Sequence, residues 1–275
     1  TKTGYGFAGW FVDEELTGPF NGYMTTGDLT LYAKWEAGVV GYAVNHNIQN
    51  ANNNSYTTTT VYGNATADTV VTPELIEVGE GFVAPATQTV TVRADGTTVI
   101  NYYYTREVHT LTVDKADGSA PVSTSYKYGA DVKVSEPTRT GYTFAGWATS
   151  ANGEKVYDDK ATISNITSNI TLYAKWTPNA NTAYTVKHYK QQLDGTYSAT
   201  PNETDNLTGT TAASVTPAVK SYTGFTAPST KTVTIAADGS TVVTYQYTRN
   251  SYTVTWEPAG GNWNGDTNDK VVEHK

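Results

Sequence analysis

The sequence repeats itself, and this self-similarity limits the possible folds more than any other feature. TKTGYGFAGW at residues 1–10 returns as TRTGYTFAGW at 138–147, and LYAKW at 31–35 returns unchanged at 172–176. We call the module that contains both motifs B. A chain built of recurring units of this size is expected to fold as small modules in series, each packed mainly against its neighbours.

A second recurring module, M, lies between the copies of B. QTVTVRADGTTVINYYYTR at 88–106 matches KTVTIAADGSTVVTYQYTR at 231–249. Upstream, YAVNH at 42–46 aligns with YTVKH at 184–188. The two modules therefore alternate along the chain.

The two ends of the chain supply the parts of one further B module. YTVTWEPAGG at 252–261 corresponds to HTLTVDKADG at 109–118, and joining Lys275 to Thr1 reproduces the sequence pattern of 131–147. Because the chain begins at Thr1 and not at a methionine, we expect it to be one period of a longer array. The predicted modules are the C-terminal part of B (1–36), M (37–106), complete B (107–176), M (177–250) and the N-terminal part of B (251–275).

Composition favours strands over helices. The chain has 21 Tyr and many Thr and Val, whereas charged residues make up only 16%. Such residues suit a pleated, half-buried surface. We therefore predict mostly β modules in a linear tandem array, with about one short helix in each, the helix candidates being 158–165 and 207–218.

Turn and core residues follow from the same pattern. Asp238-Gly239 lies between the alternating stretches 232–236 and 241–247, which predicts a β-hairpin with a tight turn. Asp95-Gly96 predicts the same in the first M module. The predicted core residues of the complete B module are Phe144, Trp147, Leu172, Tyr173 and Trp176.

At this level of detail the modules resemble known families. GYTFAGWATSANGEKVYDDKATISNITSNITLYAKW, residues 141–176, resembles the internalin-B-type B repeat, and residues 4–35 repeat the signature. The M modules, with their opening strand at 184–189 and their closing ADG segment, are similar to MucBP-type mucin-binding repeats. The resemblance implies α+β modules of the β-grasp (ubiquitin-like) type. It also implies a surface protein of a Gram-positive bacterium, located on the cell surface or in the cell wall.

Several function classes are disfavoured. A net charge of −8 argues against nucleic-acid binding, and no apolar run is long enough to cross a membrane. The chain has no Cys, which excludes disulfides and thiolate metal ligands. No catalytic motif is present, so we expect no enzyme, no catalytic residue and no cofactor. Asp266, Asn268 and Asp269 only partly match a calcium loop, so we also expect no metal site.

Tyrosines are the candidates for ligand contact. Aromatic rings stack on sugars, which makes Tyr189, Tyr197 and Tyr222 of the second M module possible glycan contacts. Cross-strand Tyr pairs that only stabilise the sheet are the alternative. The matched pairs Trp10/Trp147 and Trp35/Trp176 are better explained as core residues.

Two functions remain open. The first is a non-catalytic stalk or fibre segment whose partners are the neighbouring repeats and, if chains self-assemble, identical chains in a filament. The second is an adhesin module for mucin or another host glycan. Lys–Asn isopeptide or Thr–Gln ester cross-links, known in surface fibres, are a further possibility for which the sequence indicates no particular pair.

Overall fold

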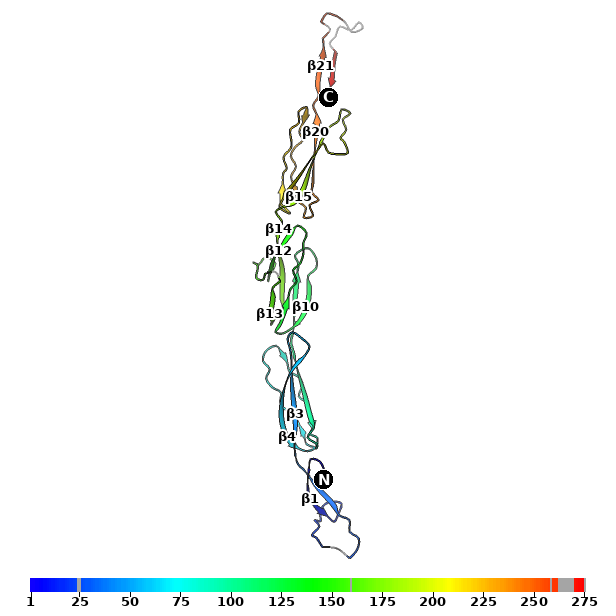
Figure 1. Ribbon diagram of the computed structural model, residues 1–275, viewed down its shortest axis with the longest axis vertical. Coiled ribbons are helices and arrows are strands. Elements are labelled where there is room, and N and C mark those ends of the chain that lie inside the picture. The colour runs from blue at the N-terminus through cyan, green and yellow to red at the C-terminus, as the bar shows by residue number, and fades with distance from the viewer. Residues whose placement is uncertain (24–25, 159, 258, 262–269, 275) are drawn as a thin grey trace. The chain divides into compact units, whose positions relative to one another are not determined.

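The fold is built of β-strands alone in the part of the chain that the structure describes. The computed structural model describes residues 1–23, 26–158, 160–257, 259–261 and 270–274, and every helix or strand assigned there is a β-strand (Figure 1). The mostly β prediction is therefore confirmed. The finer prediction of α+β, β-grasp modules is not supported, because that fold requires a helix.

Both predicted helices are wrong. Of residues 158–165, the stretch from Thr162 joins a strand that runs to Ile166, and Ile163 and Ile166 are buried. Residues 207–218 contain the end of one strand, at Gly209, and a second short strand. β-Branched Thr and Val lose rotamer freedom in a helix, and Gly and Pro interrupt one, so these segments favour extended structure.

The chain divides into two compact units. The first comprises Thr1–Val113, Pro121–Val134 and Lys160–Leu172. The second comprises the remaining residues, so the sequence of the complete B module is shared between the two.

The first unit contains the first M module. Its strands, with those of the adjoining B segments, are β1 (Tyr5–Phe11), β2 (Tyr32–Ala37), β3 (Val39–Gln49), β4 (Tyr56–Thr66), β5 (Val70–Val71), β6 (Phe82–Val83), β7 (Val90–Thr91), β8 (Thr98–Arg106), β9 (Val108–Asp114), β10 (Val122–Lys127), β11 (Ala130–Lys133) and β13 (Thr162–Ile166).

The first M module is a four-stranded sheet in the order β4-β3-β8-β6, with a two-stranded β5-β7 ribbon. β3 and β4 are antiparallel, whereas β3 and β8 are parallel, from Tyr42 opposite Thr98 to Ile48 opposite Tyr104. Residues on β8 alternate between buried and exposed, as one buried face of a sheet requires. The core on that face comprises Val44, Ile100, Tyr102 and Tyr104.

The second unit contains the second M module. Its strands, with those of the adjoining B segments, are β12 (Tyr142–Ala148), β14 (Ile170–Pro178), whose first residues belong to the first unit, β15 (Thr182–Lys190), β16 (Glu203–Gly209), β17 (Ser214–Val215), β18 (Phe225–Thr226), β19 (Val233–Thr234), β20 (Val242–Arg249), β21 (Tyr252–Trp256) and β22 (Lys270–His274).

The second M module repeats the topology of the first. Its sheet has the order β16-β15-β20-β18, beside a β17-β19 ribbon. β15 and β20 are parallel, from Thr185 opposite Val242 to Lys190 opposite Tyr247. The core comprises Tyr184, Val186, Ile235, Val243, Tyr245 and Tyr247.

The predicted ADG hairpins are wrong in their pairing, although the turns exist. Gly239 N–H donates to the Ala236 carbonyl at 3.0 Å, and Gly239 has a φ of 76°. However, β19 before the turn pairs with β17, and β20 after it pairs with β15 and β18. The same separation occurs around Gly96, so each turn connects two different sheets.

The B modules share one local feature. β12 pairs with β14 across a bulge between Phe144 and Gly146, and β1 pairs with β2 across an equivalent bulge between Phe7 and Gly9. Both glycines have a φ of 127°, which L side chains rarely adopt. In the complete module β12 and β14 belong to a sheet of order β10-β9-β14-β12.

The core prediction for the complete B module is partly confirmed. Trp147 and Leu172 are buried, with 1% and 0% of their surface exposed. Phe144, Tyr173 and Trp176 are only partly buried. The Trp147 counterpart in the terminal B segment, Trp10, is 48% exposed, so the matched tryptophans do not share one environment.

Candidate functional site

The three candidate glycan-contact tyrosines lie in different surroundings. Tyr189 is in β15, and Tyr197 is bridged to Gln191 in the loop that follows that strand. Tyr222 packs edge-on against Tyr247, with centroids 4.7 Å apart, and the Lys190 ammonium lies 4.1 Å from its ring centroid. Contact of these three residues with a glycan stays a prediction.

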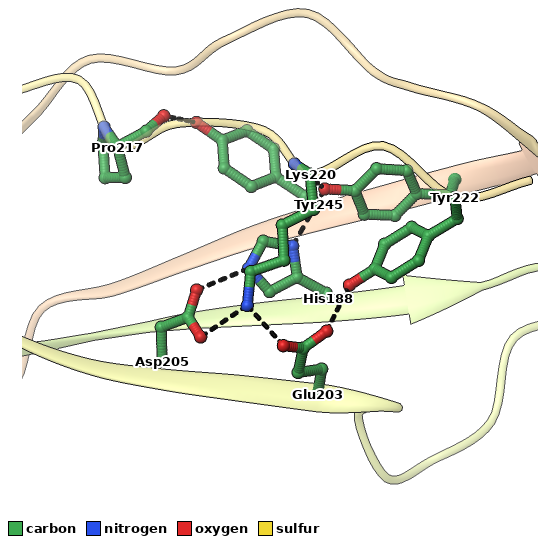
Figure 2. Close-up of polar contacts among 8 residues, drawn as sticks. His188, Glu203, Asp205, Pro217, Lys220, Tyr222 and Tyr245 are labelled. Carbon is green, nitrogen blue, oxygen red and sulfur yellow. Dashed lines mark hydrogen bonds and ion pairs between the residues drawn. The ribbon is translucent and has the colours of Figure 1, made fainter.

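Tyr222 belongs to a cluster of charged side chains on the second M module (Figure 2). Lys220 Nζ lies 2.5 Å from Glu203 Oε1 and 2.6 Å from Asp205 Oδ1. Tyr222 donates its hydroxyl proton to Glu203 Oε2 at 2.6 Å. Asp205 Oδ2 is 3.2 Å from Nε2 of His188, whose side chain is fully buried. We call His188, Glu203, Asp205, Lys220 and Tyr222 the charged cluster.

Strand geometry explains how the charged cluster assembles. Glu203 and Asp205 are two residues apart on β16, so their side chains lie on the same face of the sheet. His188 lies opposite Glu203 on β15. Lys220 and Tyr222 come from the segment between β17 and β18, whose backbone N–H at Lys220 donates to the Tyr247 hydroxyl at 2.8 Å.

Each member of the charged cluster changes the titration of its neighbours. Hydrogen bonds from Lys220 lower the pKa of Asp205 and of Glu203. In return the two carboxylates, Asp205 more than Glu203, raise the pKa of Lys220. Burial and the bond to Glu203 raise the pKa of Tyr222. The ionised carboxylates and the protonated lysine therefore stabilise one another.

The first M module has uncharged residues at the same positions. In the strand registers, Thr59 and Val61 occupy the positions of Glu203 and Asp205. Ile76 N–H donates to Tyr104 as Lys220 N–H donates to Tyr247, which makes Ile76 the counterpart of Lys220. His46 is the counterpart of His188. Among the described residues it has a tyrosine but no carboxylate as hydrogen-bond partner, and its Nδ1 lies 3.0 Å from the Tyr104 hydroxyl. Burial lowers the pKa of His46.

Buried tyrosine hydroxyls connect sheet and loops in both M modules. Tyr245 donates to the Pro217 carbonyl at 2.7 Å and accepts from Lys231 N–H at 3.2 Å. Tyr102 makes the matching bonds, to the Pro73 carbonyl at 2.9 Å and from Gln88 N–H at 3.1 Å. These fully buried tyrosines thus serve the fold, because their hydroxyls satisfy backbone groups.

Backbone hydrogen bonds join each B segment to the M module that follows it. Gly38 N–H donates to the Gly4 carbonyl at 2.8 Å, and Ala67 N–H donates to the Gly38 carbonyl at 2.8 Å. At the second junction Asn179 N–H donates to the Gly141 carbonyl at 2.9 Å, and Thr211 N–H donates to the Asn179 carbonyl at 2.9 Å. The same ladder therefore occurs at both junctions.

Close approach of backbones makes glycine necessary at these junctions. A Cβ on Gly141 would lie 2.6 Å from the Ala237 carbonyl oxygen, and Gly141 has a φ of 77°. Gly4, with a φ of 75°, meets the backbone of Ala94 in the same way. The junction glycines thus allow the ADG turn of an M module to touch the preceding B segment.

A different set of contacts joins the first M module to the complete B module. Arg106 stacks on Phe82 at 4.4 Å and donates from Nε to the Gln49 carbonyl at 2.7 Å. Its Nη1 donates to the Tyr128 carbonyl at 2.9 Å, and Tyr128 N–H donates to the Glu107 carbonyl at 2.8 Å. Arg106, at the end of β8, therefore contacts both the first M module and the complete B module.

An aromatic depression lies on the terminal B segment of the first unit. Phe7 is 50% exposed there and Trp10 48%. Phe7 lies edge-on to both Trp10 and Trp35, at 5.3 and 5.4 Å. The depression is lined by Thr1, Lys2, Tyr5, Phe7, Trp10 and Trp35.

Within the described residues, no group of three or more His, Cys, Asp or Glu side chains is placed to hold a metal ion. No helix there is long and apolar enough to span a membrane. Asp266, Asn268 and Asp269, the partial calcium motif, lie outside the described residues.

Comparison with known proteins matches the B segments to a bacterial repeat family. The model of the Listeria-Bacteroides repeat domain (Flg_new) matches residues 1–34 and 109–175. These ranges contain the FAGW and LYAKW motifs, and the chain therefore carries repeats similar to this bacterial family.

Two individual proteins are also similar. A putative membrane protein of Evansella cellulosilytica is 28% identical over 200 residues, which is 65% of this chain. The match spans only 28% of that relative's length. Among solved structures, the Bacillus anthracis TIE protein matches with a TM-score of 0.39 and 9% identity, over 81% of this chain and 54% of its own.

Sequence reasoning missed the charged cluster and the junction glycines. The spacing of Glu203 and Asp205 was the available signal, because residues two apart on a strand share a face. For Gly4 and Gly141 the signal was their equivalent place in the TGY motif of both B segments.

Proposed function

We propose that this chain is a non-catalytic segment of a bacterial surface protein, where it acts as a stalk or fibre that carries tension. The match of its B segments to a bacterial repeat family and the putative membrane protein among its relatives support this assignment. In this proposal the B segments are of the internalin-B type, the M modules are of the MucBP type, and the protein lies on the surface or in the wall of a Gram-positive cell.

The observation that carries the proposal is the pairing of the first and last strands of each M module. β3 and β8 are parallel neighbours at the centre of the sheet of the first M module. β15 and β20 are parallel neighbours at the centre of the sheet of the second. Tension on the chain pulls the start of the first strand against the end of the last. In a parallel pair these two points lie at opposite ends, so all interstrand hydrogen bonds are sheared together and must break together.

The junctions support the same function. A stalk needs short, ordered connections, because a flexible linker would let the modules fold back on one another. Gly38 and Asn179, the connecting residues, are hydrogen bonded on both sides at the two equivalent junctions.

Single-molecule pulling in two directions tests the proposal. The chain has no Cys, so inserted cysteines are unique attachment points. Handles at Asn181→Cys and Ser251→Cys load the β15–β20 pair in shear. Handles at Asn181→Cys and Ser240→Cys pull on the starts of both strands, which lie at the same end of the parallel pair. This geometry breaks the interstrand hydrogen bonds one at a time.

We expect the shear geometry to resist a several-fold higher force than the opening geometry in the same full-length chain. Because the three attachment residues are exposed, hydrogen exchange of both variants should match that of the unmodified chain, which is the control. Equal rupture forces in the two geometries would rule out a tension-bearing M module.

Glycan binding is the alternative function. Tyr222 gives it limited support, because Lys190 and Tyr247 already contact its ring. A mucin glycan array with the whole chain tests it. Saturable binding that Tyr189→Ala or Tyr222→Ala removes would favour an adhesin, and an array without binding would reject it.

A further inference from the structure

A groove on the first M module lies where the second has its charged cluster. It has a volume of about 350 Å³ and is lined by residues of β3, of β4 and of the segment between β5 and β6. Val61, the counterpart of Asp205, lies in its wall, and so does Ile76, the counterpart of Lys220. Val61 is opposite the buried Val44, and thus on the core face of the sheet, yet it is 48% exposed. The core face is therefore open at this point.

His46 presents an unpaired hydrogen-bond donor to the groove. Only 2% of the residue is exposed, and it lies in the groove wall. Burial lowers the pKa of His46, so the ring is neutral at pH 7. Tyr104 accepts from Ile76 N–H at 2.9 Å, which leaves its own hydroxyl proton for Nδ1 of His46, 3.0 Å away. This pattern assigns the ring proton to Nε2. Nε2 has no hydrogen-bond partner in the part of the chain that the structure describes.

The second M module shows what a nitrogen in this position binds. There Nε2 of His188 lies 3.2 Å from the Asp205 carboxylate, whose charge Lys220 balances (Figure 2). The first module has Ile76 in place of that cation. Of the described residues that line the groove, Glu74 alone is charged. A carboxylate ligand would therefore lack a cation and meet a like charge, whereas an uncharged oxygen fits the groove.

One side of the groove is the edge strand β4. In the described sheet β4 pairs with β3 alone, so the backbone groups on its outer side have no strand partner. Proteins protect edge strands with charged residues, with Pro or by making them short. β4 has 11 residues and contains neither Pro nor a charged residue. β16, its counterpart in the second M module, has 7 residues and carries Glu203 and Asp205. β4 is therefore open to a further strand.

We propose that the first M module binds an extended peptide, which adds a strand to β4 and places a glutamine side chain in the groove. The occupant is a peptide because a free strand edge offers hydrogen bonds to another backbone. Glutamine fits because its amide has an oxygen for His46 Nε2 and N–H donors for the Glu74 carboxylate. It is also long, as required of a residue on a strand about 10 Å, or two strand spacings, from β3. This binding goes beyond the stalk function, which requires no ligand.

A phage-displayed library of random peptides, selected on the whole chain, supplies the probe. We expect the selected peptides to share one glutamine within a β-branched, uncharged stretch. Binding of the strongest, as a synthetic peptide, is measured by fluorescence anisotropy. Replacing its glutamine by glutamate should weaken binding by about tenfold or more, because a charge would enter the groove without a cation. The peptide should also slow hydrogen exchange of β4 amides, since a new strand protects them.

A double variant closes the groove by copying the second M module. Val61→Asp with Ile76→Lys supplies a carboxylate for His46 and a cation for that carboxylate, an arrangement that the fold accepts around His188. It should abolish peptide binding. Val99→Asp with Val83→Lys adds the same charges at positions that are 52% and 53% exposed and lie outside the groove. This control should bind the peptide as the unmodified chain does.

Four results would overturn the proposal. They are a selection that yields no peptide, equal binding by the double variant, equal binding of the glutamate peptide, and slowed exchange that spares β4. A mucin glycan that binds in place of any peptide, and is lost in the double variant, would also overturn it by assigning the groove to another class of ligand. None of these outcomes affects the pulling experiment, which loads the second M module.

Discussion

At the level of single residues, the two M modules differ in the side chains near an equivalent buried histidine. The second has Glu203, Asp205 and Lys220 beside His188. The first has Thr59, Val61 and Ile76 at the corresponding positions. An ion cluster replaced by apolar residues of suitable size often leaves stability unchanged, whereas removing one member leaves its partners uncompensated. The first module shows that the fold accepts an uncharged set.

Lys220→Ile alone should therefore destabilise the second M module, because Glu203 and Asp205 would lose their shared cation. We expect the loss to be smaller than the roughly 3–5 kcal/mol typical of a buried pair, since the Lys220 side chain is 30% exposed. Val78, two residues after Ile76, is the counterpart of Tyr222. Replacing the set with its counterparts (Glu203→Thr, Asp205→Val, Lys220→Ile and Tyr222→Val) should restore stability to within about 1 kcal/mol.

Hydrogen exchange of the β15 backbone amides measures both changes, because that strand lies at the centre of the sheet. A quadruple variant less stable than Lys220→Ile would show that the charged cluster is required for the fold of this module.

At the level of elements, the junction ladders depend on glycine. Gly141→Ala should weaken the contact between the B segment and the second M module, because the new Cβ would meet the Ala237 carbonyl oxygen. Gly224→Ala is a matched control, since Gly224 has a φ of 80° and open space around its Cβ position. Both changes carry the cost of a left-handed backbone, about 1–2 kcal/mol, and only Gly141→Ala adds the clash.

The amides of Asn179 and Thr211, which form the ladder, are the measurement. Their hydrogen exchange should accelerate in Gly141→Ala and stay near that of the unmodified chain in Gly224→Ala. Equal rates in the two variants would contradict a role for the close approach at Gly141.

Elements were predictable from sequence where the signal was local. The alternating stretch 241–247 predicts a strand, which the structure has as β20, and the Asp238-Gly239 turn exists. Pairing was not predictable, because a turn signal fixes where the chain reverses and not which strand it joins. Thus β20 joins β15, more than 50 positions earlier, as Thr185 opposite Val242 shows.

The candidate site was even less predictable. Side chains alternate between the two faces of a strand, which places Glu203 and Asp205 on one face. Lys220, however, lies in a segment without regular structure. Its arrival beside the carboxylates depends on the tertiary fold, through the bond from its backbone to Tyr247. No pattern in a single sequence encodes such a contact.

At the level of the whole molecule, the modules should differ in stability. Residues 1–36 and 251–275 are each shorter than the roughly 40 residues below which a chain rarely buries a sufficient core. In repeat proteins stability is approximately the sum of module and neighbour contributions, so the terminal segments should unfold at lower denaturant concentration than the complete B module.

Tryptophan fluorescence can resolve this difference, because all six Trp lie in B segments: Trp10, Trp35, Trp147, Trp176, Trp256 and Trp263. At low protein concentration we expect two phases in urea, the first from the terminal segments and the second from the complete module. Trp10→Phe should reduce only the first amplitude, since Trp10 is half exposed and contributes little to a closed core. A single transition in urea would contradict the independent unfolding of the modules.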